Sequence, residues 1–165
     1  MFKKIVVVAL LAFPVGIFAQ DKIAYVNTQE VMYAMPETKA MQAELEKMQK
    51  QIETELKTLE DEFSKKYQAF AQQQDTLVES IKIRRTTELS EIRQRAESYQ
   101  QDSQQQLYKK QQDLIAPIQK KLLDTIKVVA EENGYTYVME IGAFLFTAPN
   151  ATDATPLVKK KLGLQ

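Results

Sequence analysis

Apolar residues recur at every third or fourth position between residues 37 and 70, and charged residues fill most of the positions between them. A single apolar stripe with a spacing of about 3.6 residues is typical of an amphipathic helix. Pro36 suits the first position of such a helix, because the N–H group that it lacks would have no partner there. We therefore predict a long helix with a narrow apolar face made of Met41, Leu45, Met48, Ile52, Leu56, Leu59, Phe63, Tyr67 and Phe70.

The apolar stripe breaks at residues 72–76 and then resumes. This break predicts a turn, followed by a second long helix over residues 77–133. Thr76 with Glu79 three residues later is a capping-box pattern for the start of that helix, and Gly134 is a typical C-terminal cap. The two helices are therefore predicted to fold back on each other as an antiparallel hairpin.

The stripe of the second helix becomes thin over residues 99–112, which contain seven Gln. A helix with so few apolar contacts lies largely in water, against a single partner helix. Pro117 interrupts the later part of this helix, and we predict a kink there, level with the start of the first helix near residue 36. The hairpin is thus predicted to be a slender arm that leaves a body at this level.

Short elements precede the arm. Residues 23–26 (IAYV) are a β-branched and aromatic run that predicts a strand. Asn27 with Glu30 three residues later predicts the N-terminal cap of a short helix over residues 28–33. The first strand has no neighbour in sequence to pair with, so it is predicted to meet the other end of the chain.

After Gly134 the apolar period changes from that of a helix to that of a strand. Strands are predicted over residues 135–139 and 143–147, joined as a hairpin around Gly142.

Thr155 followed by Pro156 predicts the cap and the first position of a last helix over residues 156–162, which ends at Gly163. The order of elements predicts an α+β, mainly α fold, in which a long antiparallel coiled-coil hairpin stands on a small β body.

Three short strands and two short helices make a core too small to be stable alone. Small cores usually need disulfides, metals or oligomerisation, and the sequence has no Cys. We therefore predict that an association body, residues 20–36 and 115–165, assembles with other copies of the chain. The arm is predicted to be residues 37–114, with its tip near residues 72–80. The predicted interface residues are Ile23, Tyr25, Tyr137, Met139, Phe144 and Phe146.

The first nineteen residues resemble a secretory signal peptide. Lys3 and Lys4 precede an unbroken apolar run, and Ala19 supplies a small residue for cleavage. The apolar stretch of about 15 residues is short for a membrane span, which disfavours the alternative of an uncleaved anchor. Residues 1–19 are thus predicted to direct export, and the mature chain is predicted to be soluble.

Composition excludes several classes of function. Lys and Arg together number 22, as do Asp and Glu, and this balance argues against nucleic acid as a partner. The absence of Cys and His excludes thiol chemistry, acid–base catalysis by His and most transition-metal sites. The sequence also contains no Gly-rich phosphate loop and no nucleophile motif. We expect no enzyme activity, no cofactor and no metal.

Three segments resemble the Skp/OmpH family of periplasmic chaperones: KIAYVN (residues 22–27), LIAPIQKKLLDTIKVVAEENGYTYVME (residues 114–140) and DAT (residues 153–155). The resemblance implies a homotrimer whose three helical arms enclose a cavity. It implies that the cavity holds unfolded outer-membrane β-barrel proteins without ATP in the periplasm of a Gram-negative bacterium. Well-studied family members are strongly basic, whereas this chain is neutral, which weakens the case for electrostatic attraction of clients and for lipopolysaccharide binding.

A flexible arm with a sparse apolar seam can make weak, multiple contacts with an unfolded client. The candidate client-binding residues are Phe63, Tyr67, Phe70 and Tyr99, although stripe residues of this kind also pack against the partner helix. Lys82, Arg84 and Arg85 near the tip are candidates for contact with anions or a membrane, or form an ordinary solvated helix face. The alternative function is a structural coiled-coil adaptor or spacer of the cell envelope, which would need a continuous apolar seam.

Overall fold

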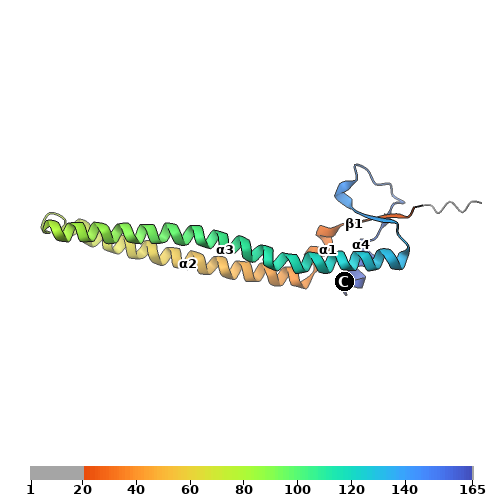
Figure 1. Ribbon diagram of the computed structural model, residues 1–165, viewed down its shortest axis with the longest axis horizontal. Coiled ribbons are helices and arrows are strands. Elements are labelled where there is room, and N and C mark those ends of the chain that lie inside the picture. The colour runs from red at the N-terminus through yellow and green to blue at the C-terminus, as the bar shows by residue number, and fades with distance from the viewer. Residues whose placement is uncertain (1–20, 165) are drawn as a thin grey trace, which may run out of the picture.

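The computed structural model describes residues 21–164, so the predicted signal peptide of residues 1–19 lies outside the described residues. Two long helices run side by side as an arm, and the short elements gather at one end of it as a body (Figure 1). The predicted α+β, mainly α class with a long helical hairpin is confirmed. The elements are β1 (Ile23–Val26), α1 (Thr28–Ala34), α2 (Pro36–Gln73), α3 (Glu79–Asn133), β2 (Tyr137–Glu140), the 3₁₀ helix η1 (Ile141–Ala143), β3 (Thr152–Asp153) and α4 (Thr155–Lys161).

The sheet has the order β2–β1–β3, and both pairs are parallel. β1 therefore lies in the centre and binds strands from the other end of the chain, as the sequence predicts. Parallel neighbours need a long crossover connection, and here the whole arm supplies it between β1 and β2. Ala24 and Val26 are buried on the helix side of the sheet.

The predicted β-hairpin of residues 135–139 and 143–147 is wrong. β2 covers most of the first predicted strand, but η1 follows it directly and residues 144–147 form no strand. The alternation of apolar residues predicted that β2 is a strand but did not predict that β1 is the strand with which it pairs. Pairing with β1 places Val138 next to the buried Ala24, whereas the Leu145 side chain is fully exposed.

Two caps match the prediction. The Asn27 side chain accepts a hydrogen bond from the Glu30 N–H group at 2.9 Å. Gly134 adopts the left-handed conformation at φ 65°, and the next N–H group, that of Tyr135, donates to the Ala130 carbonyl oxygen at 2.9 Å. Only glycine adopts this backbone conformation without a steric cost.

The other two predicted caps are wrong. α3 begins at Glu79 behind Val78, and the Thr76 hydroxyl donates to the Gln73 carbonyl oxygen at the end of α2 instead. Thr155 is the first residue of α4, and its hydroxyl accepts a bond from the Asn27 N–H group at 3.0 Å. In both cases the threonine hydroxyl forms a hydrogen bond with a backbone group outside the helix that it was predicted to cap, and residue spacing alone does not reveal this partner.

α3 continues through Pro117 to Asn133. Pro117 and Ile118 line a shallow groove together with Glu37 and Met41 of α2, which confirms the predicted level of the proline. The kink itself stays a prediction. Within residues 21–164, no helix combines the length and apolar character that crossing a membrane requires.

The core lies in the body, where the end of α3 packs against α1, α4 and the sheet. Its buried members are Val26, Val31, Met35, Ile118, Leu122, Val129 and Val158. Removing a side chain from such a core leaves a cavity as well as losing burial.

We expect Leu122→Ala to lower the free energy of unfolding by about 2–5 kcal/mol, because Leu122 is 2% exposed. The neighbouring Leu123 is 56% exposed, so Leu123→Ala should change this free energy by less than about 0.5 kcal/mol. Urea denaturation followed by circular dichroism at one fixed protein concentration measures both. Equal effects of the two variants would contradict the position of the core.

Candidate functional site

The distal half of the arm carries a cluster of aromatic residues. Phe63 and Tyr67 lie one turn apart on α2 and stack with ring centroids 6.1 Å apart and planes at 8°. The Arg93 guanidinium of α3 lies 5.4 Å from the Phe63 ring centroid, a cation–π contact. Tyr67 is 53% exposed, so this cluster presents aromatic surface to solvent although it contacts both helices.

An apolar groove adjoins this cluster between α2 and α3. Leu59 and Ile92 are buried within it, Phe63 forms part of its wall, and Glu60 and Arg93 add charged groups. The groove has a volume of about 200 Å³ and is open to solvent. A shallow apolar surface of this kind can accept an apolar side chain of another polypeptide without defining its sequence.

The predicted client-binding residues are only partly together. Phe63 and Tyr67 are in contact, and Phe70 follows them at the same end of α2, half-buried. Tyr99 is half-buried nearer the body, on α3, and is separated from this cluster along the arm. Sequence reasoning did not identify Arg93, because only the register between the helices brings it over the Phe63 ring.

Ion pairs join α2 and α3 in this register. Lys66 pairs with Glu88 at 2.5 Å and Arg95 with Glu62 at 3.1 Å in the distal half. Nearer the body, Lys110 lies 3.5 Å from Glu44, and Lys121 pairs with Glu37. The hydrogen bond from Lys66 lowers the pKa of the Glu88 carboxyl, and that from Lys121 lowers the pKa of Glu37.

The face of the sheet away from the helices is apolar and open. Ile23 pairs with Tyr137 and Tyr25 with Met139 in the parallel register, so all four side chains lie on one face. Ile23, Tyr137 and Met139 are exposed. The predicted interface residues of the two strands therefore form one surface.

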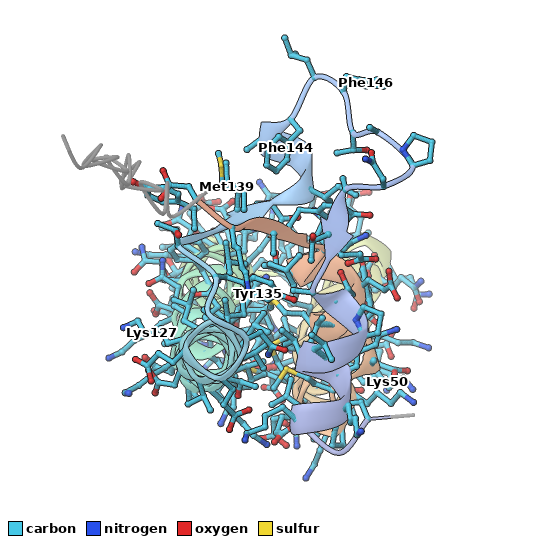
Figure 2. The ribbon with its side chains drawn as sticks, turned by 90° about the vertical axis from the view of Figure 1, so that its right-hand side faces the viewer. Lys50, Lys127, Tyr135, Met139, Phe144 and Phe146 are labelled. Carbon is cyan, nitrogen blue, oxygen red and sulfur yellow. The ribbon has the colours of Figure 1, made fainter. Side chains whose placement is uncertain are left out.

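The segment after η1 extends this apolar surface. Phe146 is exposed and Phe144 is half-buried. Met139, Phe144 and Phe146 lie on the side of the sheet away from the helices (Figure 2). Sequence reasoning missed Leu145, which is fully exposed, because the predicted strand assigned it to the opposite face from its neighbours.

The basic cluster near the tip is not purely cationic. Arg84 and Arg85 share a polar hollow with Glu88 and Glu91, and Lys82 lies outside it, half-buried. The carboxylates offset much of the positive charge of the arginines. Within residues 21–164, no group of acidic side chains is arranged to hold a metal ion.

These features describe a helical-hairpin protein that exposes apolar surface on an arm and on a sheet, a class suited to contacts with other polypeptides. The chain belongs to the family described as outer membrane protein (OmpH-like), whose sequence profile matches residues 22–162. Proteins of the Skp/OmpH family are chaperones rather than enzymes, which agrees with the expectation from the sequence.

Named relatives agree with this assignment. The chaperone protein Skp of Photorhabdus laumondii is 29% identical over 154 residues, which cover 91% of this chain and 91% of that protein. The chaperone protein Skp of Pectobacterium atrosepticum is 26% identical over 157 residues, with 93% and 92% covered. A crystal structure described as an OmpH-like outer membrane chaperone from Caulobacter crescentus has the same fold, with a TM-score of 0.78, 15% identity, and 86% of this chain and 83% of that chain covered.

The ion pairs predict that the arm is less stable in acid. The pKa of Glu88 is lowered in the folded protein, so its contribution is present above the ordinary pKa of a glutamate and is lost as the pH falls through the lowered value. We expect the loss of unfolding free energy between about pH 7 and about pH 3 to be smaller in Glu88→Gln than in the unaltered protein. Urea denaturation of both proteins at the two pH values measures this change in the free energy of unfolding.

The matched control is Glu55→Gln, since Glu55 is exposed on α2. This variant should lose as much stability in acid as the unaltered protein. If Glu88→Gln and Glu55→Gln behave alike, the Lys66–Glu88 pair does not contribute to the pH dependence.

Proposed function

We propose that the protein is a periplasmic, ATP-independent holding chaperone that binds unfolded outer-membrane β-barrel proteins between the helical arms of a homotrimer. Membership in a chaperone family supports the general activity. The observation that carries the proposal for this chain is the exposed aromatic cluster and apolar groove on an arm that stands away from the body (Figure 1).

The arm suits binding of an unfolded chain for physical reasons. With a rise of 1.5 Å per residue, the 38-residue helix α2 is about 57 Å long, so one arm presents several weak apolar contacts at different heights. A holding chaperone acts by mass action, because it keeps the unfolded client soluble without chemical work. Several arms on one body add avidity although each contact is weak.

The proposed client chemistry follows from the surface of the arm. Membrane β-barrel strands alternate apolar and polar residues and carry aromatic residues at both interfaces. Shallow surfaces lined by Phe63, Tyr67 and Leu59 accept such side chains without requiring one sequence.

The proposed homotrimer rests on the open face of the sheet. Contiguous exposed apolar patches often mark an interface, and β2 lies at the edge of the described sheet, with β1 as its one partner strand there. The segment holding Leu145 and Phe146 has no cover within residues 21–164. We infer that this segment packs on a neighbouring copy, which would bury both the edge and the apolar side chains.

The division into a body and an arm is part of the same proposal. All seven buried members of the core cluster lie in residues 20–36 and 115–165, which we assign to the association body. We assign residues 37–114 to the arm, with the tip near residues 72–80. Export by a signal peptide at residues 1–19 completes the proposal and provides the route to the periplasm.

Contact of the tip with anions or a membrane stays a prediction. Arg84 and Arg85 point to such contact by their charge, but Glu88 and Glu91 lie in the same hollow. Lys82, Arg84 and Arg85 are therefore candidates for weak contact with phosphate groups rather than a strong anion site.

The proposed activity is tested by diluting a urea-denatured outer-membrane barrel protein into the purified protein and following light scattering. We expect suppression of aggregation at equimolar trimer without ATP. Phe63→Ala with Tyr67→Ala should weaken client affinity about five- to tenfold, since aromatic residues dominate such contacts. Tyr33→Ala is the matched control, because Tyr33 is 70% exposed on α1 in the body. The affinity of this variant for the client should equal that of the unaltered protein.

Failure of the unaltered protein to suppress aggregation would overturn the chaperone proposal for this chain and would favour a structural spacer of the cell envelope. Equal affinities of the double variant and the Tyr33→Ala control would instead show that the client binds elsewhere.

Assembly is tested by sedimentation equilibrium. We expect the mature protein to have the mass of three chains, and Leu145→Asp with Phe146→Asp to shift it to the mass of one chain, because burying two carboxylates at an interface is unfavourable. Tyr33→Asp should leave the mass unchanged. A monomeric unaltered protein would contradict the proposed trimer.

A further inference from the structure

The middle of the arm lacks a buried apolar residue. Between Ile92 and Ile118 the one buried residue of α3 is Ser103, which is 4% exposed. On α2, no residue between Thr38 and Leu59 is buried. A small polar side chain therefore occupies the place where a two-helix seam usually holds Leu or Ile.

The ion pairs define the limits of this region. Glu62–Arg95 lies on its distal side and Glu44–Lys110 on its proximal side, and within the described chain no ion pair joins α2 to α3 between them. Counting inward from both pairs places Ser103 level with Ile52. We name the half-buried residues of this stretch, with Ser103, the mid-arm seam: Leu45, Met48, Ile52, Leu56, Ala96, Tyr99, Ser103 and Leu107.

The distal arm provides the contrast. Leu59, Leu89 and Ile92 are buried there, and two ion pairs join the helices. Local opening requires the least free energy where buried apolar contacts are fewest. The arm is therefore joined firmly near the body and in its distal half, and weakly in its middle.

We propose that α2 and α3 part at the mid-arm seam, and that the apolar side chains uncovered there bind apolar segments of an unfolded client. The second half of this inference rests on the proposed chaperone function. Parting exposes Met48, Ile52 and Leu56 on one helix and Tyr99 and Leu107 on the other. Methionine is unbranched and flexible, so Met48 adapts to clients of varied shape.

The test uses the absence of Cys from the chain. A single thiol introduced as Ser103→Cys is nearly the same size as the serine and reacts with a maleimide only when the seam opens. Ile92→Cys is the matched control, because Ile92 is 2% exposed in the distal arm. We expect Cys at position 103 to react about tenfold faster than Cys at position 92, each relative to the same variant unfolded in urea.

The comparison is biased against the expected result. Replacing Ile92 with Cys removes more apolar contact than replacing Ser103 with Cys, and this loss favours reaction at position 92. Equal or slower reaction at position 103 would overturn the inference. Hydrogen exchange on the unaltered chain gives a second reading, in which amides of residues 99–107 should exchange faster than those of residues 86–93. Uniform protection along the arm would also overturn the inference.

Binding is tested by repeating the thiol reaction with a urea-diluted outer-membrane barrel protein present. We expect client to slow the reaction at position 103 at least severalfold. A thiol introduced as Leu122→Cys is the control for client binding, because Leu122 lies in the core of the body and is 2% exposed; client should leave its reaction rate unchanged. An unchanged rate at position 103, with aggregation still suppressed, would overturn client binding at the seam and leave the chaperone proposal intact. Failure to suppress aggregation with rapid reaction at position 103 would overturn the proposed function and leave the opening of the seam intact.

Discussion

The structure depends on the parallel pairing of β1 with two strands from the opposite end of the chain. β2 and β3 pair with β1 and not with each other, so the sheet exists only when both chain ends are present. Side-chain bonds reinforce the same junction: Thr28 N–H donates to the Glu140 carboxylate at 3.1 Å, and Lys159 pairs with Glu30 at 2.5 Å. These contacts hold the body together at the base of the arm, and the C-terminal part of α3, which packs in the core of that body, joins the body to the arm.

The arm follows a different rule, because its two helices are held by a narrow seam and by ion pairs that are mostly exposed. Exposed pairs contribute little individually, and a two-helix seam leaves most apolar residues half-buried. The consequence is an arm whose apolar stripe remains partly open to solvent along much of its length. Tyr67 and the groove beside Phe63 contribute to the packing of the hairpin and are also open to solvent. Stability and adaptable binding therefore draw on the same side chains.

Elements with a strong local signal could be predicted from the sequence, and elements set by distant partners could not. The helical period predicted both arm helices, Asn27 marked the start of α1, and Gly134 marked the end of α3, because these signals arise within one turn. The hairpin of residues 135–147 was wrong because alternation predicts a strand but not its neighbour, and β1 is more than a hundred residues away in sequence. Likewise Phe63 and Tyr67 were identified from the stripe, but Arg93 and the buried position of Ser103 depend on the register between the helices, which no single helix shows.

The central position of β1 also determines the order in which the chain folds during synthesis. The first strand emerges early but has no partner until residues 137–153 follow, whereas the arm helices contact each other locally and form as soon as they are complete. A protein truncated before Thr152 would therefore retain an arm on a sheet with an exposed edge, which is a template for uncontrolled aggregation.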